Sequence, residues 1–407
     1  MELITAIVLT LMLAVLIHFG FQAWKKRMLS KMMARHMKPG LFTLNEYEEY
    51  ARKHLPRHIF SYFTDGAGDQ STMRRNKAAF NRYYLQQRVL TDIGTPDLST
   101  TVLGNKVAIP LGFSPVLRKN WAWKKGDLCS AEAAGKHGIC DVVPVYSESS
   151  MEEIAACNPQ GLRWLQIYIC KDESIMAALV RRAEAAGYKA IVVSIDCHWK
   201  RFVYSDWKNM IFKYLIKTSH GNFNGENFIK AYSQNVAERA SWKSITRLTQ
   251  MTKLPIVVKG VMSADDAVLA AQCGVKGVIV SNHGGRMMES LPASIEVLNE
   301  VVTAVRDKLE VYIDGGVRSG TDIIKALALG AKACFIGRPV LYGLCFKGEE
   351  GVSQILSLLR EDLERVMLCT GCASVTGITP SVIRDRHAPR SSSNVDCKCF
   401  LSPASHE

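Results

Sequence analysis

The stretch that decides the fold runs from Tyr312 to Pro339 and reads YIDGGVRSGTDIIKALALGAKACFIGRP. A short apolar run and a glycine pair come first, followed by an apolar-periodic segment that ends at Gly330 and then by a second apolar run. This order predicts strand, helix and strand, with Gly330 ending the helix. A helix that connects two strands in this way makes the strands parallel.

The same alternation extends outward from this stretch in both directions. Eight β-rich runs are separated by helical patterns, most of which end in glycine: VAIPLGFS (107–114), GICDVVPVY (138–146), LRWLQIYI (162–169), KAIVVSID (189–196), LPIVVKG (254–260), GVIVSN (277–282), VYIDGG (311–316) and ACFIGRP (333–339). Most runs are continuously apolar, as is typical of strands that are covered on both faces. The pattern predicts an α/β fold, a (β/α)₈ TIM barrel.

Shorter segments flank the predicted barrel. The segment TLNEYEEYARKHL begins with Thr43, which we expect to cap a helix together with Glu46, and a second helix should run from His58 to Asp65. The long connection from Asp196 to about Trp242 is typical of a lid or substrate loop. The chain therefore divides into a transmembrane signal-anchor (1–24), a basic juxtamembrane linker (25–42), the barrel domain (43–385) and a Ser- and Pro-containing tail predicted to be disordered (386–407).

The anchor is predicted from residues 3–23, LITAIVLTLMLAVLIHFGFQA, which contain no charged side chain. A helix needs roughly 20 such residues to cross a bilayer. Six basic residues follow without an acid: Lys25, Lys26, Arg27, Lys31, Arg35 and Lys38. The positive-inside rule then places the rest of the chain in the cytosol. A cleaved secretory signal is the alternative, but no basic segment precedes the span.

Charge and cysteine content exclude other classes of function. Much of the formal net charge of +13 lies beside the predicted span, so it indicates a membrane flank and not nucleic-acid binding. The 12 cysteines are scattered through periodic segments, as expected of small core residues in a reducing compartment. The pairs Cys369/Cys372 and Cys397/Cys399 lack the spacing of zinc-finger ligands, so we expect no metal site.

Polar residues follow six successive predicted strands. Barrel enzymes place their catalytic groups at the C-terminal ends of strands, and each of these residues lies there: Gln166, Tyr168, Ser194, Asp196, Lys259, Ser281, His283, Asp314, Gly337 and Arg338. Any one of them could be an ordinary solvated strand end. Their recurrence on strand after strand predicts an active site at this end of the barrel.

Two stretches carry a family resemblance. SNHGGRMMESLPASIEVLNEVV (281–302) and YIDGGVRSGTDIIKALALGAKACFIGRPVLYGL (312–344) closely resemble the FMN-dependent α-hydroxy-acid oxidizing family, which includes glycolate oxidase, lactate oxidase and flavocytochrome L-lactate dehydrogenase. The resemblance extends from about Thr43 to about Thr379. It implies a TIM barrel, FMN as the cofactor, a small-molecule 2-hydroxy acid as the substrate, and a tetrameric homo-oligomer.

The resemblance and the chemistry agree on the catalytic residues. Oxidation of a 2-hydroxy acid needs a base, which we assign to His283, and Asp196 would pair with the imidazolium that forms. Arg286 offers a planar fork for the substrate carboxylate. In the family, tyrosines that match Tyr62 and Tyr168 also contact the substrate.

The cofactor site is assigned in the same way. The resemblance places Lys259 beside the flavin ring, and we also assign Gln166, Ser194 and Ser281 to the cofactor site. The loops after the last two strands form the usual phosphate site of barrel enzymes. The residues that we expect there are Asp314, Gly315, Gly316, Arg318, Gly337 and Arg338.

The sequence departs from the family pattern at the flavin ring and the substrate rim. Leu117 replaces a small residue, and Pro144 replaces a serine that bonds the ring in the family. Val203 stands in place of an arginine that helps to bind the substrate in some members. Met287-Met288 and His198-Trp199 also differ from the usual residues. These departures leave substrate identity, flavin affinity and oxygen reactivity open.

The leading hypothesis is an FMN-dependent oxidase that converts a small or long-chain (S)-2-hydroxy acid into a 2-oxo acid, with O₂ as the acceptor and H₂O₂ as the product. The alternatives are a membrane-linked dehydrogenase that uses quinone or another carrier, and a weakly active flavin-barrel scaffold. The chain ends in Ser405-His406-Glu407, which is no peroxisomal address. We therefore expect a single-pass protein of the endoplasmic reticulum or the mitochondrial outer membrane, and not of the peroxisome matrix.

Overall fold

The computed structural model describes residues 41–197, 235–237 and 240–387. The predicted span 3–23, nearly all of the linker, and almost the whole tail lie outside the described residues, as do His198, Trp199 and Val203. Within the described ranges, no helix is both long and apolar enough to cross a membrane.

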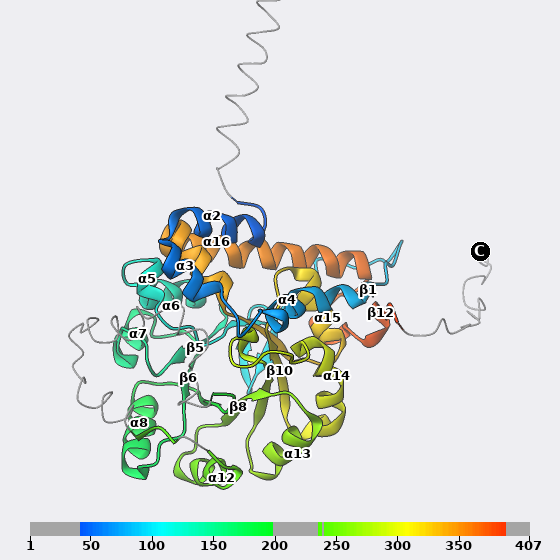
Figure 1. Cartoon of the computed structure of the whole chain (residues 1–407). Coiled ribbons are helices and arrows are strands. Elements are labelled where there is room, and N and C mark those ends of the chain that lie inside the picture. The colour runs from blue at the N-terminus through cyan, green and yellow to red at the C-terminus, as the bar shows by residue number, and fades with distance from the viewer. Residues whose placement is uncertain (1–40, 198–234, 238–239, 388–407) are drawn as a thin grey trace, which may run out of the picture. The chain divides into compact units, whose positions relative to one another are not determined.

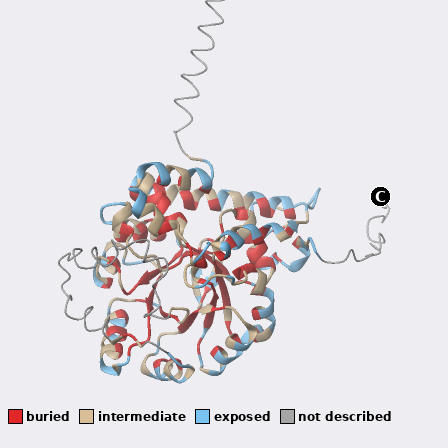
Figure 2. Cartoon of the chain, in the orientation of Figure 1, coloured by how far each residue is buried: buried red, intermediate tan, exposed pale blue. Residues whose placement is uncertain are grey.

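Eight parallel strands close into the predicted barrel (Figure 1), in the order β10-β11-β4-β5-β6-β7-β8-β9. Their bounds are β4 Leu111–Phe113, β5 Cys140–Pro144, β6 Arg163–Ile167, β7 Ala190–Ser194, β8 Ile256–Val261, β9 Gly277–Val280, β10 Glu310–Asp314 and β11 Ala333–Ile336. Nearly every strand residue is buried, as Figure 2 shows in the centre of the molecule. The continuously apolar runs of the sequence are therefore strands that are covered on both faces.

Helices surround the strands in the expected alternation: α5 Lys119–Ala122, α6 Gly126–Lys136, α7 Met151–Cys157, α8 Glu173–Ala185, α12 Trp242–Met251, α13 Ala264–Gln272, α14 Ser294–Val305, α15 Gly320–Ala328 and α16 Arg338–Thr370, which is kinked at Lys347 and Gly348. The glycines that follow α6, α8, α13 and α15 have positive φ angles of 61°, 78°, 80° and 98°. The predicted glycine helix ends are thus confirmed.

One predicted strand is wrong in its extent. The run 107–114 divides at Pro110, which has no N–H to donate to a strand ladder. Val107 belongs to a hairpin of β2 Thr100–Val102 and β3 Asn105–Val107, and the barrel strand β4 begins only at Leu111. The backbone N–H of Leu103 in this hairpin donates to Glu310 at the start of β10, at 3.0 Å. The hairpin therefore covers the N-terminal end of the barrel, opposite the predicted active site.

The N-terminal helices are α2 Leu44–His54, α3 Arg57–Thr64 and α4 Ser71–Ala78. The predicted capping box is present, because the Glu46 N–H donates to Thr43 Oγ1 at 3.3 Å and the Thr43 N–H donates to the Glu46 carboxylate at 2.9 Å. A short sheet pairs β1 Tyr83–Leu85 with β12 Ile383–Asp385. The ten described cysteines are free thiols.

Candidate active site

A cavity lies at the C-terminal ends of the barrel strands and brings most of the predicted residues together. Those that line it are Tyr62, Gln166, Tyr168, Ser194, Lys259, His283, Arg286, Asp314, Gly315, Gly316, Arg318, Gly337 and Arg338. Asp196 and Ser281 are absent from the lining and hydrogen-bond to residues that do line it. The barrel topology thus places side chains from distant sequence positions in one site.

His283 lies in a tight turn directly after β9, with an unusual positive φ of 55°. Its backbone N–H donates to Ser281 Oγ at 3.0 Å, and the Asn282 side chain accepts from the Gly285 N–H at 3.0 Å. Such a backbone conformation is costly for a residue with a side chain, and it persists only where the surroundings hold it. The turn therefore fixes the position of the imidazole.

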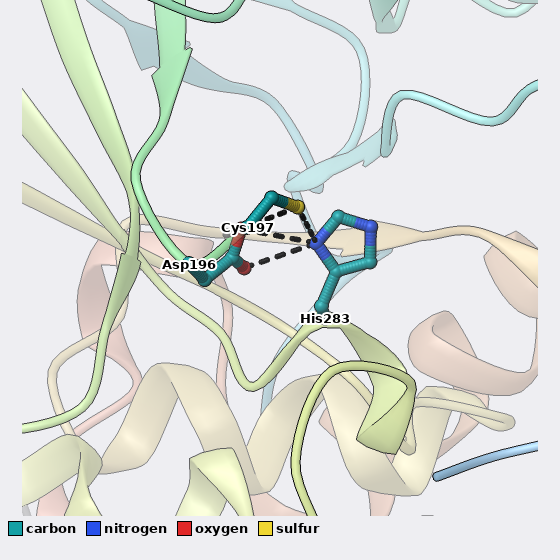
Figure 3. A group of neighbouring side chains, drawn as sticks. All are labelled: Asp196, Cys197 and His283. Carbon is teal, nitrogen blue, oxygen red and sulfur yellow. Dashed lines mark hydrogen bonds and ion pairs between the residues drawn. The ribbon is translucent and has the colours of Figure 1, made fainter. Parts of the chain in front are cut away.

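The imidazole of His283 is oriented by Asp196. Its Nδ1 lies 3.1 Å from both carboxylate oxygens, and Figure 3 shows the second ring nitrogen on the side away from the carboxylate. Burial alone would raise the pKa of Asp196, but His283 and Lys259 lower it to about 2. Asp196 is therefore ionised at neutral pH and can stabilise an imidazolium.

Cys197 completes this group, and sequence reasoning did not single it out. Its Sγ lies 3.4 Å from Asp196 Oδ1, 3.7 Å from His283 Nδ1 and 3.5 Å from Met287 Sδ. In Figure 3 the three side chains of Asp196, Cys197 and His283 point toward one another. A cysteine after a strand end carries no signal of its own, so only the fold reveals this contact.

Lys259 is a buried cation with two carboxylate neighbours. Its Nζ lies 3.3 Å from Asp314, 4.0 Å from Asp196 and 2.9 Å from Ser281 Oγ, to which it donates. Burial lowers the pKa of Lys259, but Asp314 and Asp196 more than offset this and raise it. The ammonium therefore stays charged at the base of the cavity.

Two arginines hold the loop that follows α3. Arg286 Nη1 donates to the carbonyls of Phe63 and Asp65, at 3.3 and 3.0 Å. Arg338 donates to the same two carbonyls and, at 3.0 Å, to that of Gly284. Burial and the neighbouring Arg286 lower the pKa of Arg338 to about 10. Within the described residues, Nε and Nη2 of Arg286 make no hydrogen bond, so these nitrogens can serve a ligand.

The predicted phosphate corner has a strongly positive lining. The predicted Arg318 lines the cavity, and so does Lys77, which sequence reasoning missed. Both pair with Glu48, Arg318 at 2.7 Å and Lys77 at 3.0 Å. Arg338 lines the same cavity. Lys77, Arg318 and Arg338 together outweigh the Glu48 carboxylate by a charge of +2, which matches a phosphate monoester of about −2. The cradle also needs glycine, because a Cβ on Gly316 would lie 2.0 Å from the Asn76 carbonyl oxygen.

The remaining lining fits the FMN that the sequence implies. Asp314 Oδ1 is a buried acceptor without a hydrogen-bond partner within the described residues. A hydroxyl group of the ligand could donate to this oxygen. Val116, Leu117 and Ile336 supply apolar surface. Pro144, which has no backbone N–H to donate, also lines the cavity at the end of β5, so this departure from the family pattern falls at the site. Arg318, Lys77 and Asp314 would hold the cofactor.

Comparison with known proteins agrees with this site. The family described as FMN-dependent dehydrogenase matches residues 51–385. 2-Hydroxyacid oxidase 1 from Homo sapiens is 40% identical over 361 residues, which cover 86% of this chain and 98% of that protein. Glycolate oxidase from Spinacia oleracea is 40% identical over 351 residues, covering 84% and 95%.

A solved structure shares the fold. Mandelate oxidase crystallised with 3,3-difluoro-2-hydroxy-3-phenylpropionic acid superposes with a TM-score of 0.74 and 34% identity, over 84% of this chain and 98% of its own. The family match covers most of this chain, and the relatives align almost in full. The chain therefore belongs to the FMN-dependent dehydrogenase family.

Proposed function

We propose that the protein oxidises an (S)-2-hydroxy acid to a 2-oxo acid with FMN and passes the two electrons to O₂, which forms H₂O₂. The observation that carries this proposal is the Asp196–His283 pair, with Nδ1 3.1 Å from the carboxylate, in the same cavity as Arg286 and Lys259. A base, a carboxylate-binding cation and a buried charge are the groups that this reaction needs. The names of the relatives point to the same substrate class.

Each side chain then has one task. His283 accepts a proton from the substrate, and Asp196 stabilises the positive charge that results. Arg286 binds the substrate carboxylate through its free nitrogens, and Tyr62, whose ring lies under the Arg286 guanidinium, positions that fork. FMN supplies the two-electron acceptor when it is bound. Lys259 provides the positive charge that favours electron transfer into the cavity.

The absorption spectrum of the purified protein tests this function. With FMN bound, an (S)-2-hydroxy acid should bleach the flavin spectrum without air, and admission of air should restore it. Leu117 lines the cavity in place of a small residue at the flavin ring, and its bulk would hinder the approach of O₂. This favours the second candidate, a dehydrogenase that transfers its electrons to quinone or another carrier. Bleaching that persists in air would select this candidate. A protein that takes up no flavin would instead be the weakly active scaffold.

The phosphate corner gives a separate prediction. Arg318→Gln should weaken FMN binding by roughly 10- to 150-fold, because a hydrogen bond to a charged group contributes about 1.5 to 3 kcal/mol. Fluorescence titration of the FMN-free protein measures the affinity. Arg360→Gln, at an exposed position on α16, is the matched control and should bind FMN as the wild type does. Equal FMN affinities of the two variants would mean that Arg318 does not bind the FMN phosphate.

We also propose that residues 3–23 anchor the protein with its barrel in the cytosol, at the endoplasmic reticulum or the mitochondrial outer membrane and not in the peroxisome matrix. The uncharged span and the basic run after it support this proposal. Sodium carbonate should leave the full chain in the membrane pellet, and protease should remove a tag at Glu407 from sealed membranes. A tag that protease cannot reach would contradict the proposed cytosolic position of the barrel.

Deletion of residues 1–24 should release the barrel from membranes with its FMN affinity intact, since the cavity is built from residues of the barrel domain. Gel filtration of this shortened protein also tests the tetramer that the family resemblance implies. A shortened protein that stays in the pellet would contradict the proposed anchor.

A further inference from the structure

We propose that Asp196, Cys197 and His283 form a zinc-binding site, and that a zinc ion held there inhibits the enzyme. The three residues offer a carboxylate oxygen, a thiol sulfur and an imidazole nitrogen that all lie within 4.8 Å of one another. This is a ligand set that Zn²⁺ takes in proteins. The binding site itself is independent of the proposed function, whereas the inhibition rests on the role of His283 as base.

The spacing of the ligand atoms fits one ion. At ordinary bond lengths, a tetrahedral Zn²⁺ holds a sulfur, a nitrogen and an oxygen ligand about 3.3 to 3.6 Å apart. The observed separations are 3.7 Å for Sγ–Nδ1, 3.4 Å for Sγ–Oδ1 and 3.1 Å for Nδ1–Oδ1. Each differs from the tetrahedral spacing by about 0.2 Å or less, so small side-chain movements can accommodate the ion.

The neighbours of the group favour a soft divalent cation. Met287 adds a thioether 3.5 Å from the Cys197 sulfur, and sulfur ligands select against Mg²⁺ and Ca²⁺, which prefer oxygen. A neighbouring cation, Lys259, opposes binding at 4.0 Å from Asp196 Oδ2, but it lies closer to Asp314, at 3.3 Å. The Asp196 oxygen nearest the sulfur is Oδ1, so the carboxylate can bind zinc through one oxygen and face Lys259 through the other.

The Cys197 thiol lacks the properties of a reactive cysteine. Burial and Asp196 raise the pKa of the Cys197 thiol, which disfavours a role as a nucleophile or a peroxide sensor. A metal ion displaces the thiol proton when it binds, so a buried thiol can still be a ligand.

Zinc at this position would disable the base. In the hydrogen bond to the Asp196 carboxylate, the neutral His283 ring donates the proton on Nδ1, which leaves the lone pair of the second ring nitrogen, Nε2, to act as the base. Zinc at Nδ1 would replace this hydrogen bond, and the ring proton would move to Nε2. Nε2 would then have no lone pair to accept the substrate proton, and Asp196 would neutralise the metal and not an imidazolium. Zinc should therefore slow the substrate-dependent step without releasing the cofactor from its phosphate corner.

The test uses the FMN-loaded protein, Zn²⁺ as the probe and Mg²⁺ as the control ion. X-ray absorption at the zinc edge should show one sulfur at about 2.3 Å and nitrogen or oxygen ligands at about 2.0 to 2.2 Å. Cys197→Ser should weaken zinc binding by roughly 100-fold or more, since the loss of a hydrogen-bond partner of a ligand already costs 10- to 100-fold. Cys369→Ser, which alters an exposed free thiol, should bind zinc as the wild type does.

Zinc should slow anaerobic flavin reduction in the wild type and in Cys369→Ser. At the same zinc concentrations, Cys197→Ser should reduce FMN at the rate that it shows without zinc. A zinc shell without sulfur, or equal zinc affinities of the two cysteine variants, would overturn the site. Zinc bound through Cys197 with an unchanged rate of flavin reduction would overturn the proposed inhibition, while the base role of His283 is tested separately by His283→Gln.

Discussion

The variant His283→Gln should reduce FMN with a 2-hydroxy acid roughly 10²- to 10⁴-fold more slowly than the wild type, which is the usual contribution of a general base. Glutamine can still hydrogen-bond to Asp196, but it cannot accept the substrate proton at neutral pH. FMN should stay bound, since the cations of the phosphate corner are Arg318, Lys77 and Arg338. Anaerobic stopped-flow absorbance measures the rate.

The exposed His58 gives the matched control, because His58→Gln makes the same exchange on α3 outside the cavity lining. It should reduce FMN at the wild-type rate. Near wild-type reduction by His283→Gln itself would refute the assigned base.

Lys259→Met should destabilise the folded protein by about 3 to 5 kcal/mol, the usual effect of removing one partner of a buried ion pair. The ammonium lies 3.3 Å from Asp314 and 4.0 Å from Asp196, and its loss leaves both carboxylates buried around an uncharged side chain. Urea unfolding of the FMN-free protein measures the change without a contribution from cofactor binding. Lys253→Met, at an exposed position just before β8, should leave the stability almost unchanged.

The difference in stability between Lys259→Met and the wild type should shrink in acid. The pKa of Asp196 is lowered from 3.8 to about 2 in the folded protein, so its ionised form contributes stability that is present above about pH 4 and is lost as the pH falls toward 2. Lys259 is one cause of this lowering, so the variant has less of this contribution to lose. A difference that stays constant from neutral pH to pH 3 would mean that Lys259 acts through packing and not through its charge.

The sequence determined the barrel because the relevant signals are local. Each strand is a short apolar run, and Gly138, Gly187, Gly274 and Gly330 mark helix ends through the left-handed conformation that glycine adopts without strain. The topology of a barrel then places the strand ends on one side. Residues such as Lys259 and His283 could therefore be assigned to one site before their contacts were known.

Only the tertiary structure decided which of these residues touch. Lys77 and Glu48 come from helices that precede the barrel, and no local pattern connects them with Arg318. Cys197 joins the site because the chain after β7 passes the turn after β9. The Cys197 sulfur then lies 3.7 Å from Nδ1 of His283, which is 86 residues away in the sequence. Pro110 likewise divides one apolar run between the hairpin and β4, since strand pairing depends on which partner is in reach. Contacts of this kind depend on the packing of distant segments, and the sequence alone records the residue types without their distances.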